Sequence, residues 1–202
     1  MKFLTGLSLC LLLSIPAIAQ NAREGSVRYK SEDRNGVMAD FDAPKDQTED
    51  ALAKRLDAAN IGKKNRESGY WKYEGVNWPE IAPEKVDVYF NVERHKGSSV
   101  VYMLVSTGYG NFVTTALNPQ VIENMKSFLT KFSIDLAAYQ HELALAAQQE
   151  AVADADKKLR RADRETDRAN RRRKNADQEK DKKQENVNEE KKKLEDLQKT
   201  QP

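Results

Sequence analysis

The sequence predicts an α+β protein, in which a small antiparallel sheet with helices on one face is followed by a long charged C-terminal helix or coiled coil. Three patterns predict this class. Residues 86–93 alternate between apolar and polar side chains, as in a half-buried strand. Residues 121–143 carry apolar side chains at helical spacing. Residues 150–202 hold 31 charged side chains and no aromatic one, which is too polar for a globular core but suits one long helix.

The first 19 residues have the pattern of a secretory signal peptide. Lys2 precedes an apolar run over residues 3–15, and Ala17-Ile18-Ala19 is typical of a cleavage site. The run is too short to span a hydrocarbon core of about 30 Å. The only cysteine, Cys10, lies inside it, so the mature chain has no disulfide and no cysteine ligand. Because N-glycosylation sequons are also absent, we expect an exported protein of the bacterial periplasm or cell envelope.

The polar residues 20–35 lack periodicity and predict a flexible leader with a short strand at residues 27–30. A strand is predicted over residues 36–42, where apolar and polar side chains alternate in part. The helix that follows begins at Asp46, whose spacing to Glu49 is that of a capping box.

Gly62 is expected to end this helix as a left-handed residue. Residues 70–74 predict the second strand, and the two prolines in residues 76–83 predict a loop. The alternating strand at residues 86–93 and a return strand at residues 99–107 form a hairpin. The return strand is apolar on both faces, so we expect it to be the most central strand of the sheet.

Asn118 and Pro119 begin the last helix of the predicted head domain, residues 36–143, which is large enough for one modest core. The predicted order is strand, helix, three strands and helix, with a helical tail at residues 144–202. On an ideal helix, the apolar stripe of the head lies nearly opposite the heptad pattern of the tail. Either the helix breaks near residues 144–149, or one continuous helix docks on the head and offers its other face to a partner. The absence of glycine and proline between Pro119 and Pro202 favours the continuous helix.

Small or aliphatic side chains recur at two heptad positions of the tail, which we call the seam. The middle of the seam is imperfect, because Arg173 and Lys180 occupy its first position, and Lys183 and Glu190 its second. Two interpretations stay open. The seam forms a homo-oligomer or binds a partner helix as a weak coiled coil, or the tail is a solvated single helix held by charge pairs. The seam residues are Leu145, Val152, Ala155, Leu159, Ala162, Ala169, Ala176, Val187, Leu194 and Leu197.

Nine of the 15 aromatic side chains lie within residues 70–112. A small head without cysteine needs aromatic area for its core, so core packing is one interpretation of them. The other is a platform that binds a glycan or a peptide. If helices cover only one face of the sheet, Tyr89 and Tyr102 would be exposed on the other. The candidate ligand face consists of Trp71, Tyr73, Trp78, Tyr89, Tyr102 and Tyr109.

The sequence predicts no catalytic, cofactor or metal site, and we expect a protein that is not an enzyme. His141 begins a pattern found in zinc proteases, but Leu145 stands where the second histidine would be needed. Gly108 and Gly110 lack the third glycine of a phosphate loop and predict a turn. An enzyme would instead require dispersed carboxylates to converge in one pocket, the candidates being Asp40, Asp42, Asp87 and Glu93.

The net charge is only +2, which argues against a specific nucleic-acid partner. Two basic clusters, residues 171–174 and 191–193, are flanked by acidic residues. They predict either a solvated face or a weak contact with an anionic membrane surface.

The loop Trp78-Pro79-Glu80-Ile81, the strand Val86-Asp87-Val88-Tyr89 and the charged tail together carry a resemblance. The chain resembles a family of uncharacterised exported bacterial proteins with a small α/β head and a C-terminal coiled-coil tail, whose heptads are more regular than this chain's. The resemblance implies no activity and no site residues. We therefore expect a non-enzymatic envelope protein whose tail self-associates or reaches a partner. The alternative is a ligand-binding head with the tail as spacer.

Overall fold

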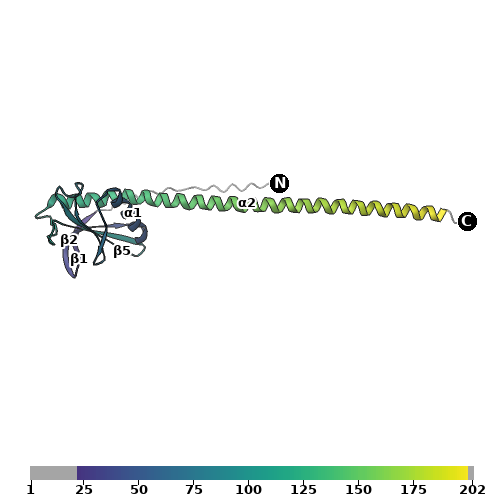
Figure 1. The fold of residues 1–202 in the computed structure, drawn as a ribbon. Coiled ribbons are helices and arrows are strands. Elements are labelled where there is room, and N and C mark those ends of the chain that lie inside the picture. The colour runs from purple at the N-terminus through teal and green to yellow at the C-terminus, as the bar shows by residue number, and fades with distance from the viewer. Residues whose placement is uncertain (1–21, 200–202) are drawn as a thin grey trace, which may run out of the picture. The chain divides into compact units, whose positions relative to one another are not determined.

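The computed structural model describes residues 22–199, with side chains as far as Leu194 (Figure 1). The signal peptide predicted at residues 1–19 therefore lies outside the described residues. The chain divides into two compact units after Glu142. We call residues 22–142 the head and residues 143–199 the tail. The head contains one antiparallel sheet and the tail is entirely helical, so the predicted α+β class is confirmed.

The sheet of the head has six strands in the order β1-β2-β6-β5-β4-β3, and all neighbours pair antiparallel. Strand β6, the predicted return strand, lies at the centre beside β5. The described elements are β1 (Arg23–Tyr29), β2 (Glu32–Phe41), α1 (Lys45–Ala58), β3 (Asn65–Glu67), β4 (Tyr70–Val76), β5 (Val86–His95), β6 (Ser98–Ser106) and α2 (Pro119–Lys199).

Residues 23–35, predicted as part of a flexible leader at residues 20–35, instead form β1 and the first part of β2. Val27 and Tyr29 of β1 are buried and alternate with exposed residues, which anchors the strand to the sheet. Lys30 and Ser31 join the two strands with φ angles of 49° and 65°. A two-residue hairpin turn needs such positive φ values, and it is usually made with glycine or asparagine. The turn therefore lacks the usual sequence signal.

Strands β2 and β6 approach closely at Gly36. A Cβ atom placed on this residue would lie 2.9 Å from the carbonyl oxygen of Met103 and 2.7 Å from Cδ2 of Leu104. Only glycine fits this approach without displacing the backbone of β6. The position predicted as the start of a strand is thus a packing point in the middle of a longer one.

Helix α1 begins before the predicted capping box. Pro44 stands at the N-cap without a side-chain hydrogen bond, so Asp46 does not cap the helix. The N–H of Thr48 donates to the carbonyl of Pro44 at 3.0 Å, and Asp46 lies in the first turn, where the helix dipole favours a carboxylate. At the other end, Asn60 (φ 50°) takes the left-handed conformation two residues before the predicted stop at Gly62.

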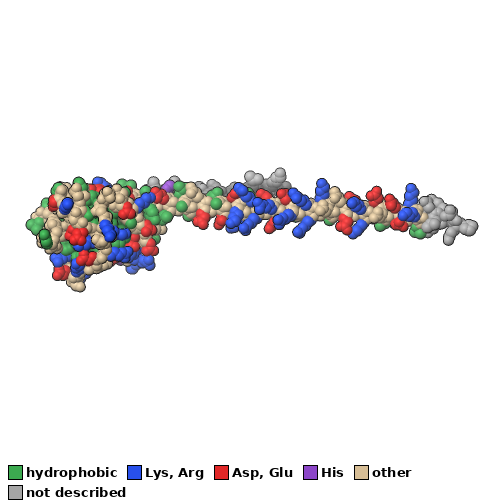
Figure 2. All heavy atoms as spheres, in the orientation of Figure 1, with side chains coloured by type: hydrophobic (Ala, Val, Ile, Leu, Met, Phe, Trp, Pro, Cys, Tyr) green, Lys and Arg blue, Asp and Glu red, His purple; other side chains and the backbone are tan. Residues whose placement is uncertain are grey.

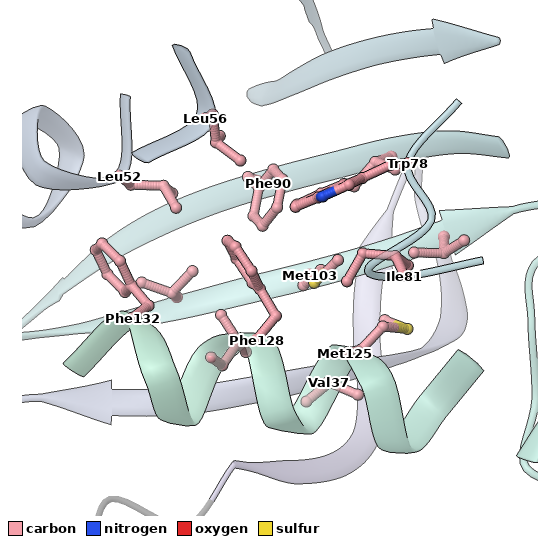
Figure 3. Close-up of a cluster of buried hydrophobic side chains, with 14 of the residues drawn as sticks. Val37, Leu52, Leu56, Trp78, Ile81, Phe90, Met103, Met125, Phe128 and Phe132 are labelled. Atoms are coloured by element: carbon pink, nitrogen blue, oxygen red, sulfur yellow. The ribbon is translucent and has the colours of Figure 1, made fainter. Parts of the chain in front are cut away.

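Both helices contribute to a core on one face of the sheet (Figure 3). Phe132 of α2 contacts Phe41 of β2 edge to face, with ring centroids 5.1 Å apart. Phe128 contacts Trp78, from the proline-containing loop, in the same way at 5.0 Å. The predicted apolar stripe of α2 is thus in the core as far as Leu136, whereas Leu143 at its predicted end is exposed. Other core side chains drawn in Figure 3 are Val37, Leu52, Leu56, Ile81, Phe90, Met103 and Met125.

Helix α2 runs without interruption over the 81 residues from Pro119 to Lys199, so the prediction of one continuous helix is confirmed. Its first turn begins where predicted, since the N–H of Ile122 donates to the carbonyl of Asn118 at 3.2 Å. Its buried stripe ends at Leu136, with Tyr139 half-buried. Within residues 22–199, no helix has the length and apolar character needed to cross a membrane.

Candidate functional site

The sheet face opposite the helices carries an aromatic cluster of its own. The ring of Tyr29 lies 5.3 Å from Tyr70, 5.1 Å from Tyr89 and 5.5 Å from Phe112, measured between centroids. Leu104 of the central strand is buried beneath them. The hydroxyl of Tyr70 donates to the backbone carbonyl of residue 28 at 2.9 Å. Such packing removes much of this face from water although neither of the two described helices, α1 and α2, covers it.

A groove of about 650 Å³ lies beside this cluster. Tyr29, Tyr89 and Phe112 provide its aromatic lining, and a loop containing Gly108 and Gly110 forms part of its edge. Aromatic side chains with polar groups around them are typical of ligand sites. The charged side chains of the groove are Lys30, Arg34, Glu67, Lys72, Glu74 and Asp87.

The charges of the groove largely neutralise one another. Lys30 and Lys72 both form ion pairs with Glu67, and Nζ of Lys72 lies 3.2 Å from its carboxylate. The hydrogen bond from Lys30 holds the pKa of the Glu67 carboxyl below its usual value. Lys72 also lies 3.5 Å from a carboxylate oxygen of Glu74. A neutral ligand therefore suits this groove better than an ion.

Arg34 differs from the other charged residues of the groove, because its ion-pair partner lies outside the groove and one of its N–H groups has no acceptor within residues 22–194. Its guanidinium pairs with Glu32 and lies over the ring of Phe112, 5.2 Å from the centroid. Its Nε atom is buried and has no hydrogen-bond partner among the residues that the structure describes. A buried N–H without an acceptor is costly, so a shift of the Arg34 side chain that brings this N–H to a ligand oxygen would be stabilising.

Tyr109 stands at the tip of the edge loop with its side chain fully exposed (106%) and a φ of 53°. Positive φ is uncommon for a residue with a bulky side chain. The loop closes through a hydrogen bond from the N–H of Asn111 to the carbonyl of Gly108 at 3.0 Å, and no helix follows it until Pro119. This is the predicted turn. It returns the chain so that Phe112 packs on the aromatic cluster.

The six predicted aromatic residues lie in three surroundings: the core beneath the helices, the cluster on the opposite face, and, for Tyr109, the exposed tip of the edge loop. Trp71, Tyr73 and Trp78 are buried in the core beneath the helices, and Tyr89 and Tyr102 belong to the opposite cluster. Only Tyr89 and Tyr109 line the groove together.

The expectation that Tyr89 would be exposed is wrong, because Tyr29 and Phe112 cover it and leave 5% exposed. Tyr102 is half-buried. The groove residues that sequence reasoning missed include Tyr29 and Phe112. The alternation of Val27 and Tyr29 is the one local signal that could have indicated the first of them.

The seam of the tail is exposed along its described length. Its large aliphatic side chains, at the first heptad position, keep about half of their surface in contact with solvent: Leu145 51%, Val152 59%, Leu159 59%, Val187 47% and Leu194 56%. The alanines at the second position, Ala155, Ala162, Ala169 and Ala176, are exposed as well. The side chain of Leu197 lies outside the described residues.

Charge pairs along the tail agree with a helix that is also stable in solvent. Asp156 and Arg160 pair at 2.9 Å, and Glu179 and Lys183 at 2.7 Å, each four residues apart. Pairs of this kind contribute about 0.3–0.5 kcal/mol each. They support the helix but leave the aliphatic side chains uncovered.

The carboxylates singled out for catalysis have separate surroundings. Asp40 pairs with Arg23, Asp87 accepts the N–H of residue 75, and Glu93 accepts from the amide of residue 91. Asp42 is exposed. Of the four, only Asp87 lines the groove. In residues 22–194, no three side chains of the metal-binding types lie close enough to hold an ion.

Comparison with protein-family models, with curated proteins and with solved structures finds no match to this chain. The resemblance to exported proteins with a helical tail therefore stays a prediction.

Proposed function

We propose that this chain is an exported, non-enzymatic protein of the bacterial cell envelope whose tail joins two copies of the chain. The observation that carries the proposal is the row of half-exposed aliphatic side chains at every seventh position in two stretches of an uninterrupted helix, residues 145–159 and 187–194. Burying the exposed half of one such side chain contributes about 1 kcal/mol, so the row supports a weak dimer. The signal-peptide pattern at residues 1–19 supports export.

The middle of the seam favours an antiparallel pair. A parallel pair in register would place Arg173 and Lys180 against their own copies, and like charges at a core position repel. An antiparallel pair that sets Arg173 opposite Ala162 of the second copy also sets Lys180 opposite Ala155. The small alanines leave room for the aliphatic stems of the basic side chains, whose charged ends reach solvent. In the same register Leu159 faces Ala176, whereas Val152 faces Lys183 and Leu145 faces Glu190, so the burial of the aliphatic row is partial and the dimer weak.

The flanking charges fit the same register. Lys158 then faces Glu179 of the second copy, and Glu165 faces Arg172, each twice by symmetry. These four contacts are attractive and outnumber the two repulsive contacts of Asp156 with Asp177 on the other flank of the seam, so they influence the register more than they add affinity. No interaction within one helix links Glu165 and Arg172, because they are seven residues apart.

Light scattering coupled to size exclusion, on the mature chain over residues 20–202, tests the dimer. Glu165→Lys should weaken it several-fold, and Arg172→Glu added to that variant should restore it. Glu185→Lys changes the charge equally at a position away from the seam, and should have no effect. A monomer for the unaltered chain would contradict the proposal, and a failed rescue would exclude this antiparallel register. Cell fractionation tests export, which requires a shorter chain outside the cytoplasm.

A second candidate function is glycan binding by the groove of the head. The exposed Tyr109 beside an aromatic lining favours it, and so does the orphan Nε of Arg34 in a groove whose ions are already paired. Sugar rings stack on aromatic faces, and their hydroxyls accept N–H donors. The groove lies on a sheet face and not along an open strand edge, which suits a glycan better than an added peptide strand.

Calorimetric titration of the mature chain with a panel of neutral oligosaccharides tests this candidate. Tyr109→Ala should weaken binding at least tenfold. Leu117→Ala removes another exposed side chain (80%) outside the groove and should leave binding unchanged. Absence of binding across the panel, or equal losses in the two variants, would exclude the groove as a glycan site.

A further inference from the structure

The middle of the tail carries far more positive charge than the chain as a whole. Residues 157–174 contain ten basic and three acidic side chains, whereas the whole chain has a net charge of +2. Figure 2 shows the blue side chains of lysine and arginine gathered along this part of the helix. All of these residues are exposed. A local excess of this size creates an attractive field for anions that the net charge conceals.

Most of this charge lies on one side of the helix. At about 100° per residue, six basic side chains fall within a sector of about 100°, and no acidic residue between them falls in that sector. Among the described ion pairs, only Arg160 of the six is engaged, with Asp156 at 2.9 Å. We call these six side chains the basic stripe: Lys157, Arg160, Arg161, Arg164, Arg168 and Arg171.

The basic stripe and the seam occupy opposite sides of the same turns. Leu159, Ala162 and Ala169 of the seam lie about 130–150° from the centre of the stripe. All six stripe residues are at heptad positions that face away from a coiled-coil partner. Pairing of two tails through the seam would therefore leave both stripes exposed.

We propose that the basic stripe binds the phosphate groups of an anionic lipid membrane, with the helix lying along the surface. Five of the six side chains are arginines, whose planar guanidinium groups donate paired hydrogen bonds to phosphate oxygens. The stripe runs along one side of a regular helix for on the order of 20 Å, so all six can reach a flat array of headgroups together. Opposite the stripe, Leu159 is the one large apolar side chain between residues 157 and 171, which is too little for an inserting helix, so binding is electrostatic and peripheral.

Nucleic acid is the competing polyanion, and the tail lacks the features that would favour it. Proteins that bind single strands stack bases on aromatic side chains, and no aromatic residue follows Tyr139. The groove of a duplex winds away from a straight row of cations after about one turn, whereas a membrane does not. The choice of lipid rests also on the proposed export, which places the tail where phosphate-bearing membrane surfaces are available.

Co-sedimentation with vesicles tests the proposal on the mature chain. Vesicles of phosphatidylcholine with phosphatidylglycerol should bind the chain at low salt, and high salt or phosphatidylcholine alone should abolish binding. Arg164→Gln with Arg168→Gln should lower the partition coefficient roughly 25-fold, at about fivefold for each charge near an anionic surface. Lys182→Gln with Lys192→Gln is the control, because it removes the same charge outside the stripe. The partition coefficient of this control should stay at least fivefold higher than that of the stripe variant. Glutamine keeps helix propensity, and circular dichroism verifies that both variants remain helical.

Equal losses in the two variants would overturn the stripe as the binding surface, as would equal binding to neutral vesicles. Tighter binding to a duplex or single-stranded oligonucleotide than to anionic vesicles would overturn the lipid as its ligand. Light scattering on the same samples separates this proposal from the dimer, since a monomer that still binds anionic vesicles refutes only the dimer. A chain that binds vesicles but stays in the cytoplasm refutes only the export.

Discussion

A single hydrogen bond between hydroxyl groups joins α1 to the central strand β6 inside the apolar core. Thr48 and Ser99 are both fully buried, and their hydroxyl oxygens are 2.8 Å apart. The hydroxyl of Thr48 donates to the carbonyl of Pro44 at 3.2 Å, so the hydroxyl of Ser99 donates to Thr48. Ser99 has no other side-chain hydrogen bond in the described part of the chain. The two residues therefore depend on this bond unequally.

The asymmetry sets the expected free energies of unfolding. Thr48→Val keeps the side-chain shape but leaves the Ser99 hydroxyl buried without a partner, which should cost about 1–3 kcal/mol. Ser99→Ala leaves Thr48 its bond to Pro44, and should cost about 0.5–1.5 kcal/mol. The double variant contains no unpaired hydroxyl at this place. Its cost should fall below the sum of the single costs by about 1 kcal/mol or more.

Urea unfolding followed by tryptophan fluorescence measures these costs. Trp71 and Trp78 are the only tryptophans of the chain and are buried in the head, so the signal reports the head alone. Thr130→Val is the matched control, because Thr130 makes the same kind of bond to a backbone carbonyl four residues earlier on an exposed helix face, at 2.9 Å. It should change the unfolding free energy by less than about 0.5 kcal/mol. Strictly additive costs in the double variant would refute the reasoning.

Two further predictions concern glycine packing and tyrosine burial. Gly36→Ala should lower the free energy of unfolding by about 1–3 kcal/mol, because its Cβ meets a backbone carbonyl of β6. Gly25→Ala should cost less, because its Cβ meets only the flexible end of Met38, and equal urea midpoints for the two variants would contradict this. Burial raises the pKa of Tyr70 and of Tyr73 from 10.0 to about 12. The folded head then holds these protons longer than the unfolded chain, so its stability is complete below pH 10 and falls as the pH rises to about 12. A urea midpoint that stays constant over that interval, while tyrosinate absorbance rises, would exclude the effect.

The elements predicted correctly are those whose local hydrophobic pattern specifies which of their faces is buried. The alternation in β5 and the apolar stripe of α2 each specify a buried face, so the hairpin and the helix follow from them. The edge strands β1 and β3 were not predicted as strands of these lengths, because only Val27 and Tyr29 among their residues are buried and their pairing is decided by the neighbouring strand. The turns at residues 30–31 and 68–69 fix those pairings, and the first of them contains no glycine.

The groove could not be predicted, because its lining residues are brought together only by the pairing of strands that are far apart in the sequence. Tyr29 comes from β1, Tyr89 from β5 and Phe112 from the loop after β6, and no spacing in the sequence relates the three. The positions of the seam, by contrast, follow from the sequence once the helix is continuous, because a heptad repeat places its residues on one side of a helix, while their pairing with a partner stays a prediction. The basic stripe belongs to the same helix, yet clusters of consecutive charges conceal it until the residues are placed around the axis.

The uninterrupted course of α2 gives one helix two different dynamic regimes. We expect its amides near Phe128 and Phe132 to be protected from hydrogen exchange until the whole head unfolds, because their side chains are in the core. Beyond Leu143 every described side chain is exposed, so those amides exchange by local opening. Starting a helix is the unfavourable step in its formation, and extending it is cheap. The folded head therefore supplies the nucleus from which the tail propagates, and a tail cut from the head must form that nucleus for itself.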